Sequence, residues 1–176
     1  MCNARRVSVI LVATLVLSTG LSAAWQQPAR RAVTPAAAAR DPFVGVWKLS
    51  AEKSKYEAGG APKSFTRTYE DRGGGTIFMT TDVTIPQGST RAYLVYRRDG
   101  KPYPEAALGA ESIRMVSVRA VDPRTEDVYF IIDGKTSEKP STITISRDGT
   151  TMTQVVNGTN AKGQPFTNTV IYDRQP

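Results

Sequence analysis

The sequence predicts an all-β fold, a single antiparallel up-and-down β-barrel of about nine or ten strands that follows an N-terminal signal peptide. From residue 42 onward, short runs rich in Thr, Val, Ile and Tyr alternate with turn sequences built from Gly, Pro, Asp and Asn. No segment of this region carries a helical hydrophobic stripe longer than AEKSKYEA (51–58), which has room for one short helical turn. Consecutive hairpins favour a closed barrel because closure removes exposed sheet edges, although the residue pattern also fits a sandwich.

The predicted strands follow one another with few long connections. They are FVGVWKLS (43–50), KSFTRTYE (63–70), TIFMTTDVTI (76–85), TRAYLVYRR (90–98), SIRMVSVRAV (112–121), DVYFII (127–132), STITIS (141–146), TMTQVV (151–156) and PFTNTVIYDR (165–174). RGGG (72–75), DGKPYP (99–104) and DPRTE (122–126) are expected to be turns, and Asp148 and Gly149 are expected at the tip of a hairpin.

Residues 1–24 are predicted to form a signal peptide. Arg5 and Arg6 precede an apolar run at 7–17, and a stretch of small residues ends at Ala24, the expected cleavage point. The apolar run is shorter than the roughly 20 residues of a typical membrane-spanning helix, and an uncleaved anchor is the alternative. We therefore expect export to the periplasm or secretion.

The two segments after the expected cleavage point differ in composition. Residues 25–41 are rich in Pro, Ala and Arg without hydrophobic periodicity, and we expect a disordered linker there. Residues 42–175 are expected to form the barrel domain. We expect this domain to be a monomer without stable membrane insertion.

The formal net charge of +7 does not indicate nucleic-acid binding. Five of the 23 Lys and Arg residues lie in the first 40 positions, which contain no acidic residue. The remaining bases are scattered among 16 acidic residues. A protein that binds phosphate backbones needs a clustered excess of positive charge, so no nucleic-acid partner is expected.

The residue types also argue against catalysis and against a metal or cofactor site. The chain has no histidine, and its single cysteine, Cys2, precedes the apolar run of the signal peptide. The common nucleophile–base pairs, disulfides and soft metal sites therefore have no residues to form them after cleavage. Glu126 and Asp127 are adjacent carboxylates, but a strand would place them on opposite faces, and a solvated turn is the expected setting. We expect no enzyme activity, no cofactor and no metal.

The two ends of the predicted barrel resemble known families. FVGVWKL (43–49) resembles the opening strand of lipocalins and fatty-acid-binding proteins, and NTVIYDR (168–174) resembles the closing strand of intracellular fatty-acid-binding proteins. Residues 43–174 as a whole are similar to exported bacterial lipocalin-like proteins, which are calycin-type β-barrels. The resemblance implies that Gly45 lets the chain bend tightly and that Trp47 closes the base of the barrel. Arg174 is expected to cover the Trp47 indole, as arginine often covers aromatic rings.

Two departures from the fatty-acid-binding proteins concern the ligand site. Their helix-turn-helix lid is replaced here by the short segment AEKSKYEAGGAP (51–62). Val170 stands where those proteins hold the fatty-acid carboxylate with an arginine, two residues before the closing Tyr172. The resemblance therefore implies a barrel, but not the carboxylate site of that family.

The candidate ligand-binding residues are polar or aromatic side chains that alternate with other residues along predicted strands. They are Arg67, Tyr69, Tyr93, Arg97, Arg119 and Tyr172. An interior lined by such groups would suit an amphipathic ligand with an anionic or hydroxylated head. Alternation sets the period of a strand and not its direction, so the same faces could point outward.

These observations lead to two functional hypotheses. The first is an exported lipocalin-like β-barrel that binds a small hydrophobic or amphipathic ligand and catalyses no reaction. The second is a filled barrel without a ligand that acts through its surface as an envelope protein-interaction or structural module. Interior volume distinguishes the two, because a barrel of this size can be filled by side chains or can hold one ligand.

Overall fold

A computed structural model describes residues 40–109, 114–160 and 162–176, so the predicted signal peptide and the linker up to residue 39 lie outside the described residues. The strands are β1 (Gly45–Leu49), β2 (Ser64–Asp71), β3 (Thr76–Ile85), β4 (Gly88–Arg97), β5 (Asp99–Ala107), β6 (Arg114–Asp122), β7 (Thr125–Ile132), β8 (Lys135–Thr136), β9 (Ser141–Ile145), β10 (Thr151–Thr159) and β11 (Pro165–Arg174). The described residues contain no helix, and thus none long and apolar enough to cross a membrane.

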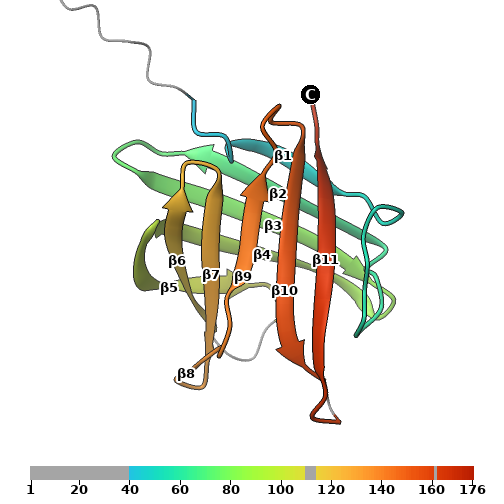
Figure 1. Ribbon diagram of the computed structural model, residues 1–176. Helices are drawn as coiled ribbons and strands as arrows, with labels where there is room; N and C mark the ends of the chain where they lie inside the picture. Colours follow the sequence, from blue (N-terminus) through green and yellow to red (C-terminus); the bar gives the residue numbers. More distant parts are fainter. Residues whose placement is uncertain (1–39, 110–113, 161) are drawn as a thin grey trace, which may run out of the picture. The chain divides into compact units, whose positions relative to one another are not determined.

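The strands close into an antiparallel up-and-down barrel of ten strands, as the sequence predicts. Each barrel strand pairs with its neighbour along the chain, and the pairing of β1 with β11 joins the two ends of the sheet. β8 is a two-residue strand that pairs with the end of β7, and β9 takes the next place in the ring. In Figure 1, β6, β7 and β9–β11 form the near side of the barrel, and β1–β4 cross behind them.

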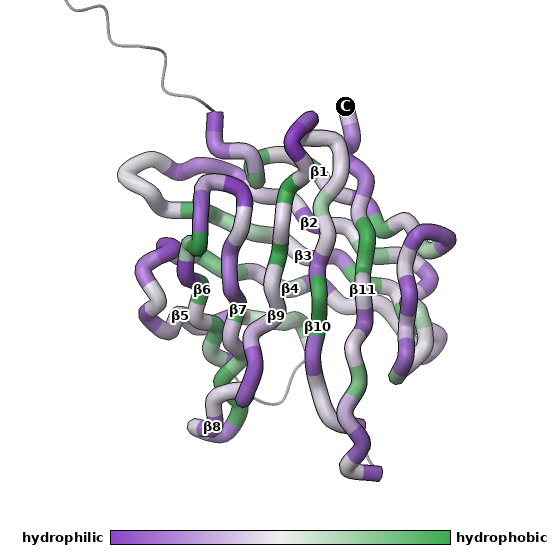
Figure 2. The backbone as a smooth tube through the Cα atoms, in the orientation of Figure 1, coloured by the Kyte–Doolittle hydropathy of each residue, from purple (hydrophilic) through white to green (hydrophobic). Residues whose placement is uncertain are grey.

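Side-chain alternation builds the interior. Figure 2 shows hydrophobic and hydrophilic residues alternating along β9, β10 and β11. β2 and β3 turn odd-numbered residues inward, whereas β4, β6 and β7 turn even-numbered residues inward. Because the side-chain period of a strand is two, one inward residue fixes the orientation of the whole strand.

One end of the barrel is closed by a packed aromatic core. Trp47 is fully buried, and its Nε1 donates a hydrogen bond to the Phe43 carbonyl at 2.8 Å. Arg174 lies on the indole, with its guanidinium carbon 4.2 Å from the ring centroid. The same guanidinium donates to the carbonyls of Gly149 at 2.6 Å, of Val44 at 2.7 Å and of Pro42.

Gly45 makes room for this arrangement. Its φ is +138°, a conformation that side chains disfavour, and a Cβ at this position would lie 2.6 Å from Nη1 of Arg174. The glycine and the arginine, which lie far apart in the sequence, therefore meet over Trp47.

Four aspartates at the closed end share one geometry: three are at hairpin turns, and Asp99 is the first residue of β5. Asp71, Asp99, Asp122 and Asp148 each accept a hydrogen bond from the backbone N–H two residues further on. This Asx turn satisfies a backbone donor that a tight turn would otherwise leave free. The predicted hairpin tip at Asp148 and Gly149 is present, with Gly149 at φ +72°.

Two local expectations differ from the structure. DGKPYP (99–104) is the first part of β5 instead of a turn, with an irregularity between Asp99 and Pro102 in its pairing with β6. Prolines are tolerated there because an irregular pairing does not need every backbone N–H. The segment at 51–58 forms turns and bends and no helix.

Candidate ligand-binding cavity

The barrel contains a cavity that opens at the end opposite Trp47. Its volume is about 750 Å³, within the range of small-molecule sites, roughly 300–1,000 Å³. Ile85, Leu108 and Ile132 line the cavity near the ends of β3, β5 and β7, and they are 42%, 64% and 52% exposed. We call this end the mouth.

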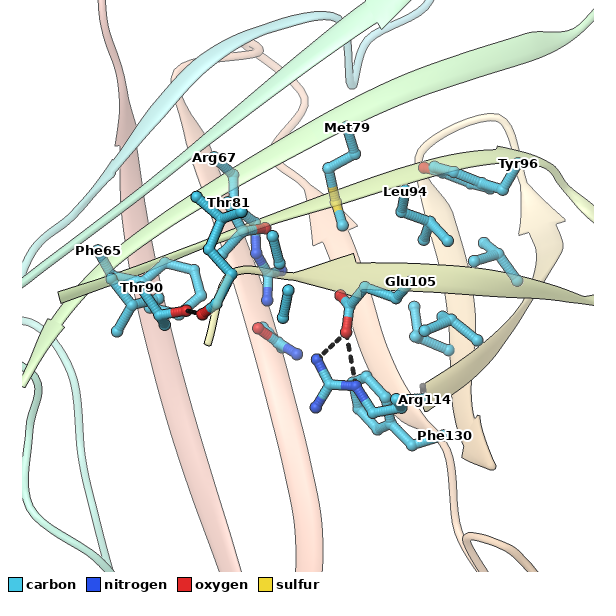
Figure 3. A pocket seen from close by; sticks show the side chains of 18 of the residues that line it. Phe65, Arg67, Met79, Thr81, Thr90, Leu94, Tyr96, Glu105, Arg114 and Phe130 are labelled. Carbon is cyan, nitrogen blue, oxygen red and sulfur yellow. Dashed lines mark hydrogen bonds and ion pairs between the residues drawn. The ribbon is translucent and has the colours of Figure 1, made fainter. Parts of the chain in front are cut away.

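Most of the cavity wall is apolar. The apolar lining includes Phe65, Met79, Val83, Ala92, Leu94, Ala107, Val116, Val118, Val128, Phe130 and Ile143. The polar lining includes Arg67, Tyr69, Thr81, Tyr96, Glu105, Arg114, Glu126 and Gln154. Figure 3 shows several of these side chains gathered around the cavity, with the ion pair of Glu105 and Arg114 drawn as dashed lines. An apolar wall with a few polar groups is typical of sites that bind small molecules.

Arg67 is a buried cation in this wall. β2 places it directly beside Trp47 of β1, and the residue is 9% exposed. Its guanidinium carbon lies 4.9 Å from the ring centroid of Phe65 and 5.3 Å from that of Tyr172. Among the described residues no carboxylate forms an ion pair with it, and its buried Nε has no hydrogen-bond partner. Tyr69, Tyr172 and the more distant Glu126 favour the charged form of Arg67, but no carboxylate contacts its guanidinium, and burial without such a contact is costly.

Two buried phenols also lack partners. Tyr69 and Tyr96 are each 1% exposed, and neither hydroxyl forms a hydrogen bond within the described residues. Burial raises the pKa of Tyr69 to about 12, although the neighbouring Arg67 opposes this shift. Burial likewise raises the pKa of Tyr96 well above its ordinary value. Both phenols therefore keep their protons at neutral pH and can donate to a ligand atom.

Glu126 is the acidic group at the closed end of the cavity. It is 1% exposed, and Nε of Arg98 donates to its carboxylate at 2.7 Å. Arg98 also pairs with Asp41, and its guanidinium carbon lies 4.5 Å from the Phe43 ring centroid. Burial raises the pKa of Glu126, and the charge of Arg98 opposes the shift. This network ties the residues before β1 to the base of the barrel.

The expectation that Glu126 lies in a solvated turn is wrong. β7 begins at Thr125, so Glu126 is already part of a strand and faces inward. Asp127 faces the other way and pairs with Arg119 at 3.1 Å. The two carboxylates lie on opposite faces, as alternation along a strand requires, and the expected solvated turn at Glu126 is absent.

The structure brings three of the six candidate residues together. Arg67 and Tyr69 line the cavity. Tyr172 is buried beside them, and its hydroxyl donates to Oε1 of Gln154 at 3.4 Å. The role of these residues in ligand binding stays a prediction.

The other three candidates lie outside the cavity. Tyr93 stacks on Phe78 on the outer face, with ring centroids 6.2 Å apart. Arg97 is exposed, and Arg119 is in the outer ion pair with Asp127. The structure therefore does not support a role for them in the interior, because β4 and β6 turn their other face inward.

Sequence analysis missed Tyr96, Glu105, Arg114 and Gln154 as lining residues. One signal was present on β4, where the odd-numbered face carries Arg91 and Arg97 and the even-numbered face, which includes Ala92, Leu94 and Tyr96, carries no charge. Two charges on one face favour its exposure to solvent. Glu105 gave no comparable signal, because it follows a segment whose strand character the prolines conceal.

Within the described residues, no group of three or more Asp, Glu, His or Cys side chains is arranged to hold a metal ion.

Comparisons with known proteins do not identify a family. No protein-family model matches the chain, and no curated protein matches it. Among solved structures, a redesigned β-barrel matches with 16% sequence identity over 77% of this chain and 93% of that chain, at a TM-score of 0.44. A similarity of this strength does not indicate a ligand or an activity.

Proposed function

We propose that the barrel binds a small amphipathic molecule, with its apolar part in the cavity and its anionic head group at Arg67. The observation that carries this proposal is a buried guanidinium in the cavity wall that has no carboxylate partner among the described residues. An arginine forms two parallel hydrogen bonds with a carboxylate, and the apolar surroundings strengthen such a pair.

The neighbouring donors support an anionic or hydroxylated head group. The unpaired hydroxyl of Tyr69 belongs to the residue two positions from Arg67 on the same strand face, and Gln154 lines the same cavity. The open volume of about 750 Å³ favours a ligand-binding barrel over the filled barrel considered as the alternative.

The proposal includes three expectations that rest on the sequence. The protein is a binding protein without catalytic activity, since its sequence lacks histidine and its only cysteine is Cys2. It is exported through the N-terminal segment at 1–24, and it acts in the periplasm or after secretion. It is related to the lipocalin-like barrels that its strand ends resemble.

The test is calorimetric titration of the purified protein with dodecanoic acid and with dodecanol, which share a chain and differ in the head group. We expect the acid to bind about tenfold or more tightly than the alcohol, because a hydrogen bond to a charged group adds roughly 1.5–3 kcal/mol. Arg67→Leu is expected to remove this preference. Arg119→Leu removes an outward-facing arginine and serves as the matched control, with the preference retained.

Two results would contradict the proposal. Failure of both compounds to bind would exclude the cavity as a site for such chains. Equal binding of acid and alcohol to the unaltered protein would exclude Arg67 as the head-group site.

A further inference from the structure

A second polar group faces the cavity, and the head-group site at Arg67 does not use it. Glu105 near the end of β5 and Arg114 at the start of β6 are direct partners across the two strands. Nε of Arg114 donates to Oε2 of Glu105 at 2.6 Å, and Nη2 contacts the same oxygen. We call these two residues the mouth pair, because they lie near the end of β5 and at the start of β6, toward the mouth of the barrel.

The mouth pair is part of the cavity wall. Both residues line the cavity, and Figure 3 shows the pair beside Phe130. Glu105 is only 6% exposed, and the guanidinium carbon of Arg114 lies 4.6 Å from the Phe130 ring centroid. The two partners differ in burial, because 42% of the Arg114 side chain is exposed whereas the Glu105 carboxylate is enclosed by the cavity wall.

The geometry of the pair leaves one acceptor and one donor free. Both contacts from Arg114 go to Oε2, so Oε1 of Glu105 and Nη1 of Arg114 have no hydrogen-bond partner among the described residues. Neither atom is among the fully buried polar atoms that lack a partner, so both remain accessible from the cavity, where a ligand group can reach them. A ligand group that both donates and accepts would satisfy the two atoms together.

The net charge of the mouth pair determines which kind of ligand group can bind there. Glu105 and Arg114 neutralise each other, so the site offers no excess charge to a second ion. A hydroxyl donates one hydrogen bond and accepts others without carrying charge. A carboxylate at the same place would face Glu105, and its charge would lack a free cation.

The two polar sites are on strands that are not neighbours in the sheet. β3 and β4 separate β2, which carries Arg67, from β5, which carries Glu105. Three inter-strand spacings correspond to roughly 14 Å around the barrel. Apolar side chains such as Met79 and Leu94 lie on the strands between them and line the same cavity.

We propose that the ligand is an amphipathic acid with a second, uncharged hydroxyl group at the far end of its apolar chain. The acid pairs with Arg67, and the hydroxyl donates to Glu105 and accepts from Arg114. This inference rests on the proposed function, because it assumes that the acid occupies the site at Arg67.

The test compares three probes of equal chain length by calorimetric titration: dodecanoic acid, ω-hydroxydodecanoic acid and dodecanedioic acid. The hydroxy acid is expected to bind about tenfold more tightly than dodecanoic acid, since it gains a hydrogen bond to a charged group. The dioic acid is expected to bind more weakly than dodecanoic acid because its second carboxylate faces Glu105.

Two variants test whether the mouth pair causes this order of affinities among the three probes. The double variant Glu105→Leu/Arg114→Leu removes both charges and leaves no buried ion, and it should abolish the advantage of the hydroxy acid. Glu105→Gln leaves Arg114 unpaired, and it should increase affinity for the dioic acid above that of the unaltered protein. That gain cannot result from unfolding. Asp82→Leu/Arg91→Leu removes an exposed ion pair of β3 and β4 and is the matched control.

The outcomes separate the two proposals. If dodecanoic acid does not bind, the proposed function fails. If it binds and the hydroxy acid binds no more tightly, the second site is overturned while the first stands. A hydroxyl advantage that persists in Glu105→Leu/Arg114→Leu also overturns the assignment to the mouth pair.

Discussion

Arg67 has a buried charge that costs stability, and the proposed function assigns the ligand head group to it. Its guanidinium is buried between two aromatic rings, and among the described residues it forms no ion pair. Burying an unpaired charge destabilises the fold, and only part of this cost returns through contacts with the rings. Local rules of stability are broken mostly at functional or strained sites, and this is why the proposed function assigns the head group to Arg67.

This view predicts that Arg67→Leu does not destabilise the ligand-free protein. The melting temperature of the variant should equal or exceed that of the unaltered protein, because leucine fits an apolar wall without a desolvation cost. Thermal unfolding followed by circular dichroism measures it, with Arg119→Leu as the outer-surface control. A decrease of several degrees in Arg67→Leu alone would assign Arg67 a structural role instead.

Arg174 is the opposite case, a cation whose contacts all stabilise the fold. It covers Trp47 and donates to three backbone carbonyls, of Pro42, Val44 and Gly149. Arg174→Ala should lower the free energy of unfolding by about 2 kcal/mol or more, since charged donors are lost from buried carbonyls. Arg174→Lys should recover little of this loss because an ammonium group lacks the planar fork. Urea unfolding measures both, and an unchanged midpoint in Arg174→Ala would refute the role.

At the scale of elements, Asp99, Asp122 and Asp148 link the fold to pH, because hydrogen bonds at the closed end lower the pKa of each carboxyl. Asp148 is the best example, because the Ser146 hydroxyl and the Thr150 N–H lower its pKa to about 2 from an ordinary 3.8. Since the folded-state pKa is the lower one, the ionised carboxylate contributes its full stabilisation above about pH 4. That contribution disappears as the pH falls toward 2.

The expected result is a pH-dependent difference between the protein and Asp148→Asn. The unaltered protein should melt at the higher temperature at pH 7, and the difference should shrink between pH 4 and pH 2 as Asp148 is protonated. Melting curves across this range measure it. Glu138→Gln alters an exposed carboxylate without a hydrogen bond in the described structure and is the control. A difference that stays constant down to pH 2 would contradict the role of the ionised Asp148.

The same elements show how far sequence alone predicts this fold. Strand period, turn chemistry and the sequence of hairpins predicted an up-and-down barrel of about nine or ten strands, although β5 was not among the segments expected to be strands. The direction of each face is not encoded locally, so β2 was oriented correctly whereas the residues chosen on β4 and β6 point outward. Glu126 was assigned to a turn because Asp-Pro and neighbouring acids are typical of turns, and only the pairing of β6 with β7 places it in a strand.

The cavity itself could not be predicted, because it depends on which faces point inward on several strands at once. Glu105 shows the difficulty, since a charged residue between Pro104 and two alanines has the composition of a surface segment. Its burial becomes visible only when β5 closes against β4 and β6.

At the scale of the whole molecule, the barrel is closed by Trp47 and Arg174 at one end and open to a largely apolar cavity at the other. Arg67 supplies a cation inside this cavity, and the mouth pair supplies a neutral polar site. An interior with this distribution of charge matches a molecule that is apolar along most of its length and acidic at one end. The central claim is therefore that the protein carries such a molecule.

Native mass spectrometry of the protein purified from its own envelope fraction tests this claim most directly. The unaltered protein and Arg119→Leu should each carry a stoichiometric small-molecule adduct that is released on denaturation, and Arg67→Leu should carry little or none. Bare masses in all three proteins, or the same adduct retained in Arg67→Leu, would contradict the claim.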